Sequence, residues 1–121
     1  MNLNHLHLHV ESPARAAAFY EAWFGMRQLI WHGDMVFMRD EAGMDLALAP
    51  HGPGGPEPLP SWFHIGFRLS DQPAVEALHA RMRAAGAPIR EALTVEDDFI
   101  YFRTADPDGH LIEVYYEPDP V

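Results

Sequence analysis

The sequence predicts an α+β fold in which two β-α-β-β-β modules pair into one open, curved eight-stranded sheet, with the helices outside and a cleft between the modules. Three observations support this prediction. The same order of strand and helix patterns occurs twice, a segment rich in proline and glycine separates the two occurrences, and His5 and His64 stand at matching positions of the two opening strands, 59 residues apart.

The first half begins with residues 5–10, whose strict alternation is typical of a half-buried strand. Ser12 can cap a helix whose first turn contains Pro13, and Gly25 ends it. Short alternating segments separated by glycine-containing turns then predict three antiparallel strands, at residues 26–33, 35–40 and 44–50.

The second half repeats this order after a linker at residues 51–61. A strand at 62–69 precedes a helix at 72–86, which Ser70 or Asp71 can cap. Three more strands are expected at residues 88–95, 99–105 and 111–117, the last two joined by a type I turn at 106–109. We therefore divide the chain into modules at residues 1–50 and 62–121, which together make one structural domain.

Composition limits the function classes. The chain has 121 residues, no cysteine, eight histidines and a net charge of -10. Without cysteine, a transition metal must be held by nitrogen and oxygen ligands, and so acidic a chain is not expected to bind nucleic acid or an anionic membrane. The absence of a leader-like segment or a long apolar run leads us to expect a cytoplasmic protein that does not span a membrane.

The opening strand carries His5, His7 and His9 on one face. A strand rises about 3.3 Å per residue, so His5 and His9 are roughly 13 Å apart along the backbone and cannot share one ion. At most two neighbouring histidines can chelate together. The rival cupin-type interpretation, with Glu11 as the acid, is disfavoured because a helix begins at Pro13.

Equivalent inward positions of the two halves are expected to meet at the floor of the cleft. Aligning Gly43 with Gly109 places Ala47 opposite Glu113, so only the second half supplies an acid. His5, His64 and Glu113 then form a predicted metal site that leaves open coordination positions, preferring Fe2+ or Mn2+, with Zn2+ or Ni2+ as alternatives. A buried carboxylate at position 113 would be costly without a cation nearby, which strengthens the prediction.

These residues resemble the vicinal oxygen chelate superfamily, which includes glyoxalases, bleomycin-resistance proteins, extradiol dioxygenases and fosfomycin-resistance thiol transferases. The resemblance is carried by HLHLHVESPARAAAFYEAWFGM, HIGFRLSD and DPDGHLIEVYY and covers nearly the whole chain. It implies the paired-module fold and metal ligation at His5, His64 and Glu113.

The resemblance also implies a metalloenzyme whose small substrate presents two neighbouring oxygens. Ala47 stands where the four-ligand glyoxalases have a second acid, so a three-ligand site favours a dioxygenase or a thiol transferase. The transferases need a basic pocket that usually includes lysine, which this chain lacks, so we prefer the dioxygenase-like activity, with a lyase, isomerase or thiol transferase next. The alternatives are a binding protein that sequesters a small aromatic compound without turnover and a metal-stabilised domain with no small-molecule role.

Four further residues are predicted to surround the metal. His7 suits a proton carrier or a wall histidine, Arg68 and Arg103 can orient an anionic or enolic substrate, and Tyr115 shares the face of Glu113. A homodimer is expected, with the cleft built within one chain or by exchange of modules between two. Residues at helical spacing are expected in the core, namely Phe19, Trp23, Leu78 and Met82.

Overall fold

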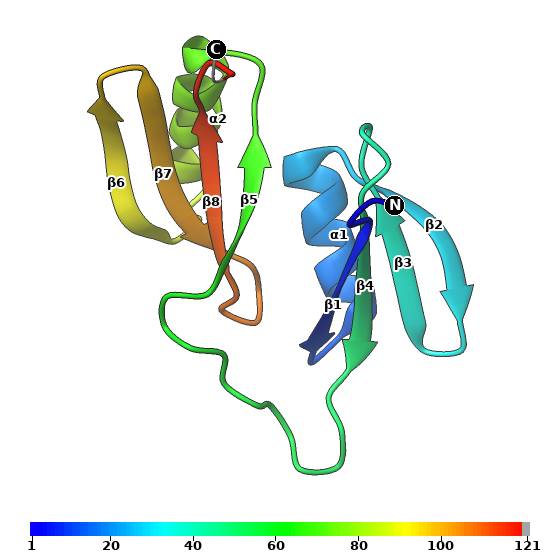
Figure 1. Ribbon diagram of the computed structural model, residues 1–121. Helices are drawn as coiled ribbons and strands as arrows, with labels where there is room; N and C mark the ends of the chain where they lie inside the picture. Colours follow the sequence, from blue (N-terminus) through cyan, green and yellow to red (C-terminus); the bar gives the residue numbers. More distant parts are fainter. Residues whose placement is uncertain (120–121) are drawn as a thin grey trace. The chain divides into compact units, whose positions relative to one another are not determined.

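The computed structural model of the protein describes residues 1–119 as two compact units, which we call the first unit (Met1–Leu59) and the second unit (from Pro60 onward). Among these residues, each unit contains one helix and four strands, which are labelled in Figure 1. The boundary between the units lies in the proline-rich and glycine-rich segment at 51–61. The predicted α+β class and the predicted order of elements are confirmed.

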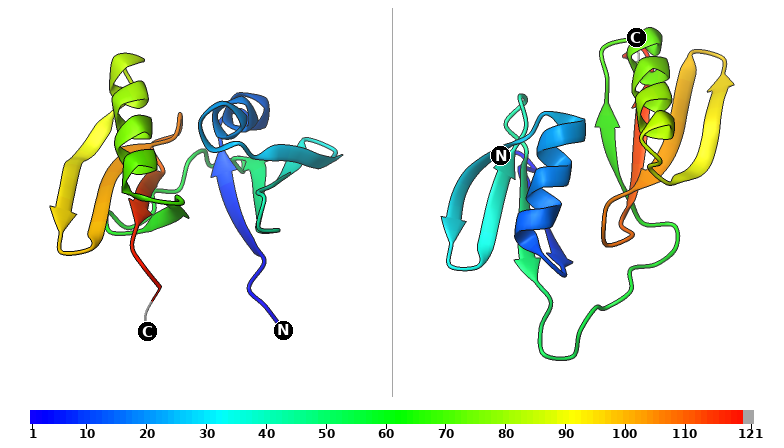
Figure 2. Two further views of the ribbon diagram at one scale, coloured as in Figure 1. Left: turned by 90° about the horizontal axis from the view of Figure 1, so that it is seen from above. Right: turned by 180° about the vertical axis from the view of Figure 1, so that it is seen from behind.

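The first unit contains one mixed sheet with the strand order β1-β4-β3-β2. Strand β1 pairs with β4 in parallel, whereas β2, β3 and β4 form an antiparallel meander. Helix α1 packs on one face of this sheet (Figure 2). The elements span β1 His5–Val10, α1 Pro13–Phe24, β2 Arg27–His32, β3 Met35–Arg39 and β4 Asp45–Pro50.

The second unit repeats this topology, with the strand order β5-β8-β7-β6 and a parallel β5–β8 pair. Helix α2 covers one face of the sheet, and we call the opposite face the open face of the unit (Figure 2). The elements span β5 His64–Arg68, α2 Gln72–Ala84, β6 Ile89–Glu96, β7 Phe99–Ala105 and β8 Leu111–Tyr116. The eight strands thus fall into two four-stranded sheets.

The duplication extends to the turn before the last strand of each unit. The Asp40 carboxylate accepts hydrogen bonds from the backbone N–H groups of Ala42 and Met44, both at 2.9 Å, and Asp106 does the same for Asp108 and His110. Each turn ends at a glycine, Gly43 or Gly109, with φ of 90° or 86°, a conformation that only glycine adopts freely. The predicted equivalence of these two glycines is confirmed.

The core of each unit lies between its helix and its sheet. In the second unit, Leu78 and Met82 of α2 are buried as predicted. Helix α2 packs on β7 and β8, whose buried residues are Ile100, Phe102, Ile112 and Val114. In the first unit, α1 buries Ala16, Ala17 and Tyr20 instead of the predicted Phe19 and Trp23, which are half-buried. The small alanines at 16 and 17 let the helix lie close to the sheet, so the larger rings are left at its flanks.

His79 makes the stability of the second unit depend on pH. Its ring packs edge-on against buried Phe102, with centroids 5.0 Å apart, and burial, followed by the Arg83 charge, lowers the pKa of His79. The unfolded chain therefore binds this proton more readily than the folded one, so stability rises with pH across the transition. The contribution is complete above the ordinary imidazole pKa of about 6.5 and is lost as pH falls from there through the lowered pKa.

We expect the free energy of unfolding, measured in urea, to decrease between about pH 7.5 and pH 5.5. The variant His79→Gln is the control, because it removes this titrating group. Its pH dependence should be smaller than that of the wild type. Equal pH dependence in the two proteins would contradict the role assigned to His79.

Candidate metal and substrate site

His64 and Glu113 lie side by side on the open face of the second unit. The parallel β5–β8 register pairs His64 with Leu111 and Gly66 with Glu113, so the two side chains are diagonal neighbours on one face. The His64 Nε2 atom lies 3.6 Å from Glu113 Oε2. The structure therefore brings two of the three predicted metal ligands together.

A backbone contact orients the His64 ring and selects its tautomer. Its Nδ1 atom lies 3.0 Å from the carbonyl oxygen of Trp62, which can only accept a hydrogen bond, so Nδ1 carries the proton. In the neutral ring, Nε2 then presents a lone pair toward a carboxylate oxygen. Two donor atoms bound to one ion at about 2.1 Å lie roughly 3.0 to 3.6 Å apart, depending on the bond angle. The pair fits two ligands of a single divalent ion.

Arg103 is the cation that already neutralises Glu113. Its Nε and Nη2 atoms donate to the same Oε2 atom, at 3.1 and 3.0 Å. The cation that the sequence argument expects near this carboxylate is therefore present as an arginine on the adjacent strand β7, so the cost of burying Glu113 no longer favours a metal. The metal prediction now depends on the geometry of His64 and Glu113 instead.

Two residues that sequence analysis did not identify complete this network. Glu91 on β6 lies 3.4 Å from Arg103 Nε and accepts a 2.7 Å hydrogen bond from the Tyr101 hydroxyl. This bond to a carboxylate, together with burial, raises the pKa of Tyr101. Two irregularities in the β6–β7 register set the position of Glu91, and no sequence signal marks them.

The Arg103–Glu113 contact could have been found from the sequence. The Asp106–Gly109 turn fixes the β7–β8 register, which pairs Arg103 with Glu113 and Tyr101 with Tyr115. The equivalent turn in the first unit pairs Arg39 with Asp45 and Phe37 with Ala47. Counting outward from each turn therefore predicts which charged residues face one another.

Tyr115 lies two residues after Glu113 on β8, on the same open face of the second unit. A Cβ atom added to Gly66 would lie 3.3 Å from the Tyr115 ring, so the missing side chain lets this ring lie close to β5. Phe99 packs edge-on with Tyr115, at 6.0 Å between centroids, and stacks on Tyr101 at 4.9 Å. Three aromatic rings therefore extend along the open face from the carboxylate.

Arg68 is held at the end of β5, away from Glu113. It forms a 2.7 Å ion pair with Asp119, donates to the Glu117 carbonyl oxygen and lies over the Tyr116 ring. The hydrogen bond that Arg68 donates to Asp119 raises the pKa of Arg68, which is already far above neutral pH. An anionic substrate would have to displace a carboxylate from Arg68, as it would from Arg103.

His5 and His7 lie on the edge strand β1 of the first unit. His5 is exposed and lies within 3.3 Å of the Asn4 side-chain oxygen. The register pairs His5 with Asp45 and His7 with Ala47. Asp45 is buried in a bidentate ion pair with Arg39, at 2.6 and 2.9 Å, and these hydrogen bonds lower the pKa of Asp45. Because Arg39 holds both of its oxygens, Asp45 is a structural residue of this unit.

Within residues 1–119, no group of three or more histidine, aspartate or glutamate side chains gathers closely enough to hold a metal ion. The His64–Glu113 pair lies in the second unit and His5 lies in the first. The three-residue site therefore remains a prediction that would draw on both units.

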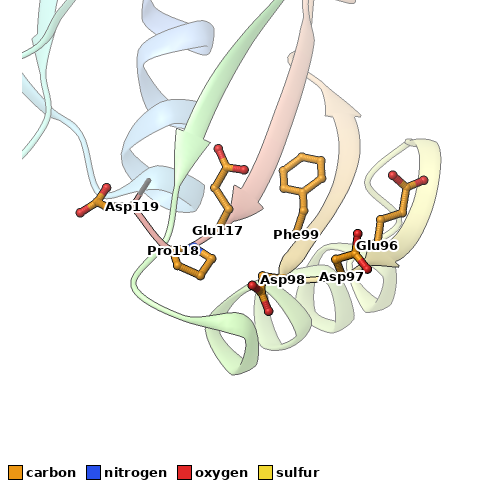
Figure 3. A pocket seen from close by; sticks show the side chains of 7 residues that line it. All are labelled: Glu96, Asp97, Asp98, Phe99, Glu117, Pro118 and Asp119. Atoms are coloured by element: carbon orange, nitrogen blue, oxygen red, sulfur yellow. The ribbon is translucent and has the colours of Figure 1, made fainter. Parts of the chain in front are cut away.

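A separate hollow of about 500 Å³ lies at the end of the second unit's sheet (Figure 3). It contains none of the predicted site residues. Figure 3 shows the ring of Phe99 between the side chains of Glu96 and Glu117, so one of the three open-face rings also borders this hollow. The lining residues are mostly acidic: Glu96, Asp97, Asp98, Phe99, Glu117, Pro118 and Asp119.

Two curated proteins are similar to this chain over most of its length. The uncharacterized protein PA2024 of Pseudomonas aeruginosa is 32% identical, with 94% of this chain and 87% of that protein covered. The metallothiol transferase FosB of Shouchella clausii is 31% identical, covering 93% of this chain and 78% of that protein.

Solved structures show the same fold. The structure of a possible glyoxalase from Bacillus cereus has a TM-score of 0.81 and 27% identity, covering 94% of this chain and 97% of that one. The fosfomycin resistance protein FosX of Listeria monocytogenes has a TM-score of 0.80 at 20% identity, covering 98% and 94% of the two chains.

None of the helices in residues 1–119 has the length and apolar character needed to span a membrane.

The family model of the Glyoxalase/Bleomycin resistance protein/Dioxygenase superfamily matches residues 2–114. With the duplicated β-α-β-β-β topology and the relatives above, this match shows that the chain belongs to that superfamily.

Proposed function

We propose that this protein is a metal-dependent enzyme that acts on a small molecule with two neighbouring oxygen atoms. The observation that carries the proposal is the 3.6 Å approach of His64 Nε2 to Glu113 Oε2, with the proton of His64 held on Nδ1 by the Trp62 carbonyl. His64 and Glu113 would hold the ion together with His5, with Fe2+ or Mn2+ preferred and Zn2+ or Ni2+ as alternatives. The bound ion would act as a Lewis acid toward the two substrate oxygens.

We propose an aromatic diol as the substrate and a dioxygenase-like reaction. Phe99, Tyr101 and Tyr115 provide a wall of rings beside Glu113, and an aromatic substrate gains from edge-on or offset contacts with such rings. Arg103 would position the substrate oxygens by exchanging one of its bonds to Glu113. His7 would act as a proton carrier when no ion is bound to its ring.

A thiol transferase is the second candidate, and the similarity to the metallothiol transferase FosB favours it. The contacts of the arginines oppose it, because Arg68 and Arg103 are both paired with carboxylates and a phosphonate would have to compete for them. A binding protein without turnover is the third candidate. It is favoured by the same Arg103–Glu113 pair, which neutralises the carboxylate without a metal.

The decisive experiment combines metal analysis with activity. Protein purified without oxygen should contain close to one equivalent of a divalent metal, and catechols should cause oxygen uptake that His64→Ala abolishes. Parallel assays should follow isomerisation of thiohemiacetals and thiol addition to fosfomycin. Catechol binding without turnover, at the same affinity in His64→Ala, would replace the enzyme with the binding protein. Thiol addition without oxygen uptake would select the transferase.

A homodimer is also part of the proposal. Edge strand β2 exposes Leu29, Ile30 and Trp31, with 37%, 48% and 41% of their surface accessible. Three consecutive apolar residues on an unpaired edge favour a contact with a second copy. Light scattering on Trp31→Glu should then report a monomer, whereas the wild type should have twice the mass of one chain.

A further inference from the structure

We propose that His7 and His9 form a second metal site, separate from the one that includes His64 and Glu113, and that it binds Cu2+, Ni2+ or Zn2+. The observation is the position of the two rings. Their centroids lie 5.1 Å apart with an interplanar angle of 73°, and both residues are exposed on the same face of β1.

The strand sets this spacing. Residues two apart on a strand project from one face and are separated by about 6.6 Å along the backbone, so their imidazoles can turn toward each other. Two nitrogens bound to one ion at about 2.1 Å with a near-right angle lie roughly 3 Å apart. Rings with centroids 5.1 Å apart can bring one nitrogen each to that separation by small side-chain rotations.

The neighbouring strand leaves room for the ion. In the β1–β4 register, His7 stands beside Ala47 and His9 beside Ala49, so the paired strand places only methyl groups beside these two positions. β1 is an edge strand, so no further strand of this sheet borders the pair on its other side. His5, in contrast, stands beside Asp45 and contacts Asn4.

The chemistry of the ligands selects the class of ion. Two imidazoles without a carboxylate suit borderline divalent ions, and affinity for such a site rises toward Cu2+. The predicted site with Glu113 includes an oxygen ligand and suits Fe2+ or Mn2+. The two sites therefore differ in the ions they prefer as well as in their residues.

The test uses Cu2+ and a variant in which the first site is removed, His64→Ala/Glu113→Gln. We expect this protein to bind one Cu2+ tightly in calorimetry, with an electron paramagnetic resonance spectrum that shows coupling to two imidazole nitrogens. Adding His7→Ala or His9→Ala should weaken binding by about tenfold or more, because a chelate becomes a single ligand. Coupling should then fall to one nitrogen.

The matched control is His5→Ala in the same background, because it removes a histidine from the same face of the same strand. Its Cu2+ affinity and nitrogen coupling should stay unchanged. The proposal is overturned if His9→Ala leaves the affinity unchanged, or if His5→Ala weakens it as much as His7→Ala does. Because the background already lacks His64 and Glu113, neither result depends on the proposed enzymatic function.

Discussion

The variant Glu113→Gln is expected to lower the affinity of the protein for Mn2+ by at least about a hundredfold and to abolish the proposed activity. Glutamine keeps the shape of glutamate, but its amide is neutral. The ion would lose the negative charge of its oxygen ligand. The affinity is measured by titrating metal-free protein with Mn2+ and following the free ion by electron paramagnetic resonance.

Two matched variants separate ligation from general electrostatics. Glu96→Gln makes the same glutamate-to-glutamine change, but at the end of β6. No contact described above joins this carboxylate to His64 or Glu113, so Mn2+ affinity should stay close to that of the wild type. Glu91→Gln removes the carboxylate that shares Arg103, which leaves Arg103 to Glu113 alone. Wild-type Mn2+ affinity in Glu113→Gln would exclude Glu113 as a ligand.

The variant Phe102→Ala is expected to lower the free energy of unfolding by about 3 to 5 kcal/mol. Phe102 is completely buried on the helix-facing side of β7 and packs against His79. Removing the ring loses its transfer free energy and leaves a cavity that the β-sheet cannot close. Since natural domains are stable by only about 5 to 15 kcal/mol, this is a large part of the total.

The control for this prediction is Phe99→Ala, which removes the same ring from the other face of the same strand. Phe99 is only half-buried, so its loss should cost less than half as much in urea unfolding experiments. Equal losses for the two variants would mean that the open face is buried as deeply as the helix-facing one.

Periodicity and turn residues were sufficient to predict the fold. The alternation of residues 5–10 predicts β1. Ser12 and Pro13 predict the start of α1, and Gly43 and Gly109 give the alignment of the two halves. Helix periodicity was less reliable for packing. It predicted Phe19 and Trp23 as core, although the buried face of α1 is centred on two alanines and Tyr20. Residue size alone does not show which face of a short helix lies closest to its sheet.

The candidate site was predicted only in part, for a physical reason. Alignment of the two halves identified His64 and Glu113, which the structure places together. The sequence prediction assigns Arg103 to the substrate, whereas the turn at 106–109 makes it the cross-strand neighbour of Glu113. Glu91 depends on irregular pairing between β6 and β7, which no local pattern specifies.

The Trp62 carbonyl has a consequence for mutational tolerance. The acceptor that keeps the proton on His64 Nδ1 belongs to the main chain, so every substitution at position 62 preserves it. Trp62 is 72% exposed, so its side chain can be substituted without disturbing the core. A saturation library at this position should retain the orientation of His64 in all its members, so any change in substrate preference among them would come from the side chain alone.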